Sequence, residues 1–249
     1  MRTHATPQEG LRADLVHYSN LVHARGWVAN HDGNLSVRYA EGQLLSTPTA
    51  VSKGAVVPEM LIVVSDDDGS LIQGTRKAFS ELKLHLAAYR SRPDIGAVLH
   101  AHPPTATGFA VCQQELPPPF MAEPVVSLGS RIPLVPFGMP GEPDLDAQID
   151  HALQEADALL LANHGVLTVG PDLETCFLRM ELVEHLARIS LVARQLGGPV
   201  PLPAERVAPL QAKHRNLFPR DGASAPVTGS PARAGKASDI VAQALKRLS

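Results

Sequence analysis

The sequence has little of what marks a secreted, membrane-spanning or nucleic-acid-binding protein. It contains only two cysteines in 249 residues, and its net charge is -3 with no basic block before the C-terminal tail. No apolar run approaches the ~20 residues that a membrane-spanning helix needs. Residues 1–6 lack the apolar core of a secretory signal. These absences predict a cytoplasmic protein whose partner is a small molecule, with no nucleic acid and no membrane involved.

The two cysteines, Cys112 and Cys176, lie far apart in segments whose patterns predict helices. Neither has a histidine or an acidic cluster beside it. So few cysteines, without an export signal, give no disulfide framework. We therefore expect two buried, reduced thiols and no cysteine nucleophile.

Length and composition predict one large domain followed by a tail. Hydrophobic residues make up 44% and charged residues 19%, as is ordinary for a globular domain with a sizeable core. Residues 221–238 are instead rich in Gly, Ala, Ser and Pro, which is typical of a flexible linker. Residues 239–248 have the pattern of a small amphipathic helix. The prediction is a domain over residues 1–220, and a linker with a short C-terminal helix over residues 221–249.

Helical and strand patterns alternate within the domain. Thr6 and Glu9 form a capping box around Pro7, and the helix that begins there should end near Gly26. Short apolar runs between glycines and prolines predict strands, and longer runs with a period of 3.6 predict helices. The other predicted elements are strands over residues 34–38, 43–47, 61–65, 97–102, 125–128, 132–137 and 159–164, and helices that begin at Ser80 or cover residues 105–112, 144–156 and 173–196.

Two histidines stand at the end of a predicted buried strand, in the sequence Leu99-His100-Ala101-His102-Pro103. Side chains two residues apart on a strand point to the same face, so the two imidazoles project together from backbones about 7 Å apart. The proline ends the strand and leaves the pair at its mouth. Two imidazoles placed in this way could bind one cation.

A third histidine, His164, ends the apolar run of residues 159–162 and precedes Gly165. Three neutral imidazoles with one carboxylate are a typical donor set for a zinc site that keeps room for a substrate. A histidine at a strand end is also common as a hydrogen-bonded structural residue. The spacing alone does not separate these two interpretations.

Glu81 is the candidate carboxylate. Ser80 and Glu81 open a predicted helix, and Glu81 would lie in its first turn, where the helix dipole favours a negative charge. It could serve only to cap the helix, or it could act as a metal-linked base. His85 lies on the apolar stripe of the same helix and is expected to be a hydrogen-bonded core residue.

Four segments taken together resemble the class II aldolase/adducin family, and most closely its fuculose-phosphate aldolase branch. The resemblance covers about residues 8–218, and the order and spacing of the segments are also similar to the family's. The segments are residues 33–38 (GNLSVR), Ser80-Glu81 with the helix they open, residues 92–102 (RPDIGAVLHAH) and residues 163–165 (NHG).

The resemblance implies an α/β fold, namely a three-layer α/β/α sandwich with a mostly antiparallel central sheet, and a homotetramer with active sites between subunits. It implies a divalent metal held by His100, His102 and His164, with zinc expected first and manganese, iron or cobalt as alternatives. Glu81 matches the glutamate that completes the metal sphere and then acts as the catalytic base. The related epimerases carry aspartate there, so Glu81 favours carbon–carbon bond chemistry.

The chemistry that the resemblance implies is physically consistent with these residues. Retro-aldol cleavage of a hydroxylated carbonyl compound develops negative charge on an enediolate. A metal chelated by neighbouring carbonyl and hydroxyl oxygens stabilises that charge as a Lewis acid. A displaceable carboxylate can leave the metal and transfer the proton. The resemblance therefore predicts a metal-dependent lyase, with a ketose phosphate as one candidate substrate.

The predicted substrate-binding residues are Asn34, Thr49, Ser80 and His31. The first three match small polar residues that surround the substrate phosphate in the sugar-phosphate aldolases of the family. His31 does not match, but it could supply positive charge.

Three departures from the family leave phosphate binding open. Ala50 stands where the family has glycine, Phe79 where it has serine, and His31-Asp32 where it has Thr-Ser. Phe79 removes a donor and adds bulk, and Asp32 would repel a dianion if it faced the site. Lys53, like His31, could supply a compensating positive charge.

Two other functions stay open at this point. The phenol that donates a proton in the fuculose-phosphate enzymes has no clear counterpart here; Met121 falls near its position, with Glu123 close by. A decarboxylase or dehydratase would use the same metal site with a different leaving group. A non-catalytic adducin-like interaction module is the third candidate, and the retention of every expected ligand argues against it.

Overall fold

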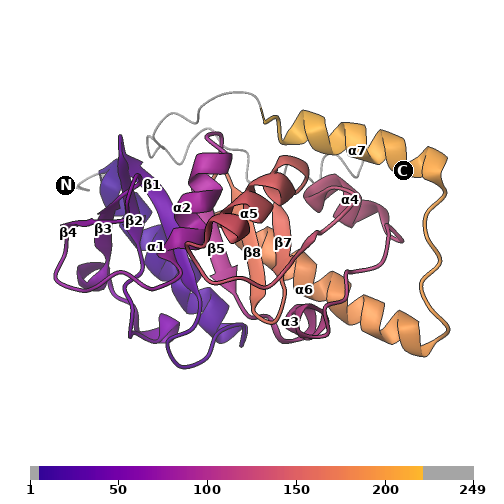
Figure 1. The fold of residues 1–249 in the computed structure, drawn as a ribbon, viewed down its shortest axis with the longest axis horizontal. Helices are drawn as coiled ribbons and strands as arrows, with labels where there is room; N and C mark the ends of the chain where they lie inside the picture. Colours follow the sequence, from indigo (N-terminus) through magenta and orange to yellow (C-terminus); the bar gives the residue numbers. More distant parts are fainter. Residues whose placement is uncertain (1–5, 221–249) are drawn as a thin grey trace, which may run out of the picture.

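The computed structural model describes residues 6–220, which form an eight-stranded sheet with helices on both faces (Figure 1). The strand order is β4-β3-β2-β1-β5-β8-β7-β6, and neighbours are antiparallel except for the parallel pair β6 and β7. The strands are β1 (Asn34–Ala40), β2 (Gln43–Ser46), β3 (Ile62–Ser65), β4 (Leu71–Gln73), β5 (Ala97–Ala101), β6 (Leu134–Val135), β7 (Ala158–Leu161) and β8 (Gly165–Gly170).

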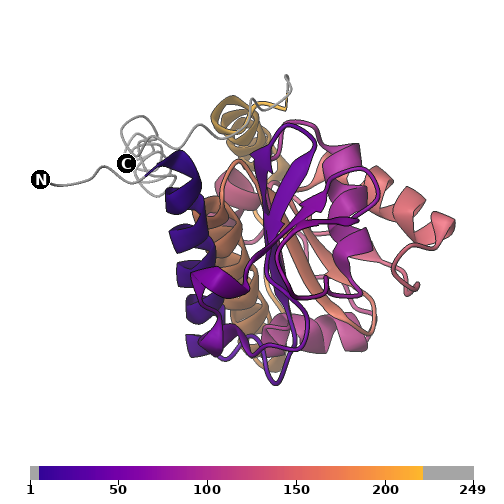
Figure 2. The same cartoon turned by 90° about the vertical axis from the view of Figure 1, so that its left-hand side faces the viewer.

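The helices form the two outer layers of the molecule (Figure 2). Helices α1, α3 and α6 cover one face of the sheet, while α2 and α5 cover the other. This is the predicted α/β/α sandwich with a mostly antiparallel sheet, which is confirmed. The helices are α1 (Pro7–Ala24), α2 (Leu82–Ser91), α3 (Pro104–Val111), α4 (Ala122–Leu128), α5 (Pro143–Glu155), α6 (Leu173–Gln195) and α7 (Ala204–Leu217), with 3-10 turns η1 (Lys53–Ala55) and η2 (Pro58–Met60).

Strand alternation decides which side chains meet α2. In β1, Leu35 and Val37 face the core under α1 and α6. Asn34 and Ser36 therefore point to the opposite face, where α2 lies. His100 of β5 lies directly across from Asn34 in the antiparallel ladder. The polar residues of two central strands thus gather beneath one helix.

The first helix and its boundaries are as the sequence predicts. Thr6 accepts a hydrogen bond from the backbone of Glu9, and the Glu9 side chain accepts one from the backbone of Thr6. The helix ends at Ala24, and Gly26 follows with φ of +69°, a conformation that glycine adopts without steric cost. The long helix α6 also matches its predicted range within one residue.

Three elements differ from the prediction in the region of residues 120–217. The strand expected over residues 125–128 is part of helix α4, and neither helix α7 nor strand β8 has a predicted counterpart. Val125 and Val126 favour strands by propensity, but their side chains are buried against Leu210 of α7. The interior proline of α7, Pro209, hides that helix in the sequence, so the partner that makes α4 a helix is hidden as well.

Smaller differences have local causes. Cys112 is exposed, contrary to expectation, because it caps the C-terminus of α3, whereas Cys176 is buried in α6 as predicted. Strand β4, an exposed edge strand, was not predicted. Within residues 6–220 no helix has the length and apolar character that a membrane crossing requires. The predicted tail over residues 221–249 lies outside the described residues, so the domain boundary stays a prediction.

The buried carboxylate of Asp157 links strand β7 by ion pairs to α2, to α6 and to the segment after α7. Asp157, at the start of β7, is 1% exposed and lies 2.9 Å from Arg92, 2.7 Å from Arg179 and 3.4 Å from Arg220. Burial opposes its ionisation, but the three arginines hold the pKa of Asp157 below its usual range. The ion pairs connect α2, α6 and the end of α7 to the sheet.

We expect Asp157→Ala to lower the free energy of unfolding by about 3–5 kcal/mol, because it leaves the buried Arg179 without a counter-charge, while Arg92 keeps Asp94. Urea unfolding followed by circular dichroism measures the change. Asp146→Ala, which breaks the more exposed 2.9 Å pair with Arg90, is the matched control and should cost less than ~1 kcal/mol. Equal losses in the two variants would contradict the role assigned to Asp157.

Candidate metal centre

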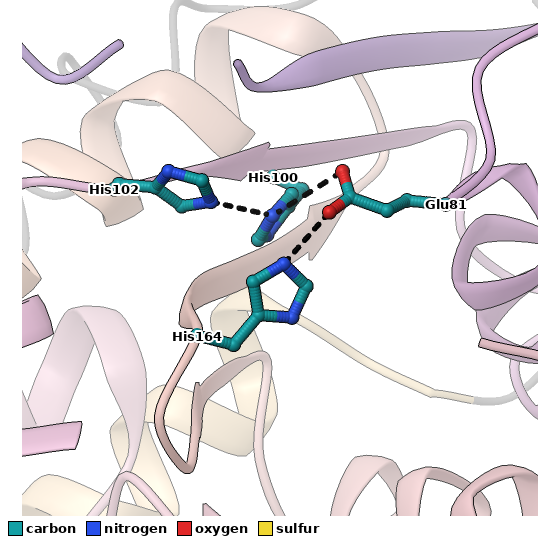
Figure 3. A group of neighbouring side chains, drawn as sticks. All are labelled: Glu81, His100, His102 and His164. Atoms are coloured by element: carbon teal, nitrogen blue, oxygen red, sulfur yellow. Dashed lines mark hydrogen bonds and ion pairs between the residues drawn. The ribbon is translucent and has the colours of Figure 1, made fainter. Parts of the chain in front are cut away.

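The structure brings together Glu81, His100, His102 and His164, which are the four residues that the sequence predicts as ligands (Figure 3). Each residue offers one nitrogen or oxygen ligand atom, and these four atoms all lie within 4.8 Å of one another. The His164 ring centroid is 4.6 Å from that of His100 and 5.5 Å from that of His102. Such a group can hold one metal ion.

Each side chain reaches the centre from a different segment. His100 is near the end of β5, and His102 directly follows that strand. His164 lies in the turn between β7 and β8, and Glu81 precedes α2. His100 is fully buried, whereas the other three are each about a quarter exposed or less. The centre is therefore open on one side.

Glu81 does not have the helical position that the sequence predicts. It is the N-cap residue of α2, outside the first turn, and its side chain makes no capping hydrogen bond. Its carboxylate instead accepts hydrogen bonds from Asn34 Nδ2 at 2.6 Å and from His164 Nε2 at 2.7 Å. The interpretation of Glu81 as a helix cap alone is wrong.

The imidazoles are oriented so that lone pairs converge. His100 donates from Nδ1 to the carbonyl of Val166 at 2.9 Å, which leaves Nε2 as an acceptor. His102 turns its Nδ1 toward Oδ2 of Asp32 at 3.5 Å. The two Nε2 atoms then lie 3.1 Å apart. At that distance a proton on Nε2 of His102 can bridge the pair, and a cation that replaces this proton can bind both nitrogens, so the donor set fits a metal ion.

The protonation states of His100, His102 and Glu81 also favour metal binding. Burial lowers the pKa of His100 to about 3, and burial also lowers the pKa of His102. Burial opposes ionisation of Glu81, but favourable interactions, first the hydrogen bond from His164 and then that from Asn34, hold the pKa of Glu81 well below its usual range. At neutral pH the centre has a carboxylate beside the neutral imidazoles of His100 and His102, which are the forms that bind metals.

The turn that carries His164 depends on two unusual positions. Asn163 has φ of +55° and bonds to the carbonyl of Val111 and to Gln113. At Gly165 an added Cβ would lie 2.5 Å from Cδ2 of His102 and 2.7 Å from the carbonyl of Ala101. Only glycine lets β8 approach the histidine pair this closely.

A second carboxylate fixes the chain just beyond His102. Glu184 of α6 is 3% exposed and accepts hydrogen bonds from the backbone of Thr105 at 3.0 Å and of Ala106 at 2.9 Å. It also accepts one from the Thr105 hydroxyl at 2.8 Å. The two backbone N–H groups belong to the first turn of α3 and have no partner within that helix. Glu184 therefore caps α3 from another helix and holds the end of the histidine strand in place.

The four predicted substrate-binding residues are placed differently from one another. Asn34 is buried and contacts Glu81 directly. Ser80 precedes Glu81 and is exposed, and His31 is exposed beside Asp32. Thr49 is half-buried, and its backbone bonds to residue 77. Among residues 6–220, the side chains of His31, Thr49 and Ser80 make no hydrogen bond or ion pair.

Two residues that bear on the expected phosphate site, Lys53 and Phe79, are buried inside the protein. Lys53 is 1% exposed and donates to the carbonyls of His31 at 3.1 Å and Val51 at 3.0 Å, and burial lowers its pKa to about 8. Phe79 is buried with its ring 5.1 Å from that of His85, so its bulk lies in the core. Ala50 has φ of +57°, a conformation that favours glycine.

The sequence alone does not predict the hydrogen-bonding partners that support the metal centre. His85 is a buried, hydrogen-bonded histidine, as predicted, but its partners Ser36 and Asn34 were not foreseen. The spacing that could have indicated them is present: Ser36 and Asn34 are two apart on a strand, and Tyr89 follows His85 by one helical turn.

Comparison with known proteins agrees with the fold and the site. Residues 13–191 match the family model of the Class II Aldolase and Adducin N-terminal domain. The chain is 31% identical to a 3-oxo-tetronate 4-phosphate decarboxylase of Escherichia coli over 77% of this chain and 91% of that protein. It is 33% identical to an L-fuculose phosphate aldolase of E. coli over 68% and 77%. A solved L-fuculose 1-phosphate aldolase superposes with a TM-score of 0.75, at 28% identity, covering 83% of this chain and 96% of that one.

We expect Gly165→Ala to weaken metal binding at least 10-fold, because the new Cβ pushes His102 out of line. Competition with a chromogenic chelator measures the affinity. Gly108→Ala in α3, where an added Cβ meets nothing within 4 Å, is the control and should leave the affinity unchanged. A Gly165→Ala protein with unaltered affinity would show that this close approach is not needed for the site.

Proposed function

The chain belongs to the class II aldolase and adducin family, and we propose that it is a metal-dependent lyase that cleaves a carbon–carbon bond in a hydroxylated carbonyl compound. The observation that carries the proposal is the convergence of three imidazoles on a carboxylate that does not cap its own helix. A helix-capping role would use the Glu81 carboxylate locally, whereas here it faces the histidines. The retained donor set argues against a non-catalytic interaction module.

The residues that would hold the metal are His100, His102 and His164, with Glu81 completing the set. Their converging lone pairs and the carboxylate suit zinc, with manganese, iron and cobalt as alternatives. When bound, a divalent ion would polarise the substrate carbonyl as a Lewis acid.

Glu81 would act as the base. Its Oε2 accepts a hydrogen bond from Asn34, which orients the carboxylate whether or not His164 binds the metal. In the cleavage direction, it takes the proton from the substrate hydroxyl whose carbon becomes an aldehyde. The electron pair of the broken carbon–carbon bond moves toward the neighbouring carbonyl oxygen. The same carboxyl group can then return the proton to the other fragment.

The far end of the substrate would lie among His31, Thr49 and Ser80, whose side chains have no partner within residues 6–220. Asn34 keeps one N–H that is not used by Glu81, so it can also donate to the substrate. The relatives named above act on phosphorylated compounds. We therefore propose a phosphorylated substrate whose phosphate is bound by hydroxyl groups and His31.

Decarboxylation is the second candidate, because one relative at 31% identity is named a 3-oxo-tetronate 4-phosphate decarboxylase. The same site could accept the electron pair left by carbon dioxide. That reaction needs no base to remove a hydroxyl proton before the bond breaks. Release of carbon dioxide without an aldehyde would identify it.

The assembly and setting follow from the family resemblance. We propose a homotetramer with active sites between subunits, a role in carbohydrate metabolism and a cytoplasmic location. Met121, which falls near the phenol of the fuculose-phosphate enzymes, precedes α4 and has no proton to donate, so Glu81 is the proposed donor of the final proton.

We expect His164→Ala to lose the metal and all activity, and Glu81→Gln to keep most of the metal while kcat for aldol cleavage falls about 10²- to 10⁴-fold. Metal content is measured by elemental analysis. Activity is measured by coupled assays with L-fuculose 1-phosphate, other ketose 1-phosphates and 3-oxo acid 4-phosphates. The amide of glutamine keeps the shape of the side chain but cannot accept a proton.

His151→Ala, an exposed histidine of α5, is the control and should retain metal and activity. Metal-loaded protein that releases no aldehyde, ketone or carbon dioxide from any of these compounds would count against the proposal. Carbon dioxide release that survives Glu81→Gln would favour decarboxylation over aldol cleavage.

A further inference from the structure

A line of buried hydrogen bonds runs from α2 through β1 to Glu81. The Tyr89 hydroxyl lies 3.0 Å from Ser36 Oγ, which lies 2.7 Å from Nδ1 of His85. His85 Nε2 lies 2.6 Å from Oδ1 of Asn34, whose Nδ2 lies 2.6 Å from Oε2 of Glu81. Tyr89, Ser36, His85 and Asn34 are each at most 3% exposed.

The chemistry of the partners sets the direction of the three bonds between Ser36 and Glu81, while the Tyr89 hydroxyl also donates to the Ser36 carbonyl at 2.9 Å. An ionised Glu81 only accepts, so Asn34 presents its NH₂ group to the carboxylate and its Oδ1 to His85. That oxygen also only accepts, so the proton of the neutral imidazole is on Nε2. His85 Nδ1 then accepts from the Ser36 hydroxyl. Burial lowers the pKa of His85 to about 3, which agrees with a neutral ring.

The periodicities of a strand and of a helix place the four residues of this line next to one another. Asn34 and Ser36 share a face of β1 because they are two apart, and His85 and Tyr89 share a face of α2 because they are four apart. Within residues 6–220 no hydrogen bond or ion pair joins His85 to the three clustered histidines. Its hydrogen-bonded link to the centre among these residues runs through Asn34, and it also interacts electrostatically with Glu81 and His100.

We propose that His85 is a positioning residue, which holds the Asn34 carboxamide so that its N–H faces Glu81 and fixes the carboxylate for proton transfer. The inference rests on the proposed role of Glu81 as base. Without the His85 donor, the amide can turn by 180° and bring its oxygen toward the carboxylate, or swing away from it. In both cases Glu81 loses a hydrogen bond and its fixed orientation.

Two substitutions separate positioning from packing. His85→Phe keeps a ring of similar size but has no donor, and His85→Gln places an amide N–H near the position of Nε2. We expect kcat to fall at least 10-fold in His85→Phe with KM changed less than threefold, and kcat to recover to within about threefold of wild type in His85→Gln. The affinity for zinc, measured by chelator competition, should fall in His85→Phe and recover in parallel.

His214→Phe is the matched control, since His214 is also buried and bonds to the carbonyl of Val126 away from the centre. It should change stability but leave kcat within twofold. Equal loss of kcat in His85→Gln and His85→Phe, or no loss in His85→Phe, would overturn the proposal.

A measurement on the unmodified protein covers the case in which His85→Phe does not fold. Long-range ¹⁵N–¹H correlation spectra distinguish the two neutral tautomers of histidine. We expect the proton of His85 on Nε2, and a proton on Nδ1 would refute the positioning role. The tautomer and the zinc affinity do not depend on finding a substrate, so they test this inference even if every lyase assay is negative.

Discussion

The close approach of two histidine nitrogens beside a carboxylate is the constraint on which the site depends. Nε2 of His100 lies 3.1 Å from Nε2 of His102 and 3.6 Å from the carboxylate of Glu81. The Val166 carbonyl accepts from the other nitrogen of His100, and Asp32 lies beside Nδ1 of His102. A cation is the natural occupant of such a point. The sheet, the turn at Gly165 and the cap at Glu184 are understood most simply as the means of holding the rings there.

Much of this arrangement could be predicted because it depends on local periodicity. Alternation along residues 97–102 is enough to place His100 and His102 on one face, and the apolar run before His164 marks another strand end. The position of Glu81 was less accessible, because a glutamate beside a helix start is equally consistent with capping. Helices α4 and α7 could not be predicted separately, since each is stabilised by burial against the other. The hydrogen-bonded line through His85 depends on how β1 packs against α2. That packing is a tertiary property, so neither segment predicts it alone.

The departures from the family show why single substitutions are poor guides to a site. Phe79 suggested a blocked substrate space, but its ring packs against His85 and helps to bury the hydrogen-bonded line. Lys53 suggested a free positive charge, but its ammonium group binds two backbone carbonyls, that of His31 in the loop that carries Asp32 and that of Val51. Both residues are therefore used within the protein itself, Phe79 beside His85 and Lys53 on backbone carbonyls.

The carboxylate of Glu184 has a further electrostatic consequence. A helix begins at Pro104, two residues after His102, and the aligned peptide dipoles of a helix give its N-terminus roughly half a positive charge. Such an end pointing toward a dication would weaken its binding. Glu184 accepts three hydrogen bonds at that end and places a carboxylate there, which Arg188 also contacts at 2.8 Å. A site for a positive ion can therefore lie beside a helix start, a place where proteins more often bind anions.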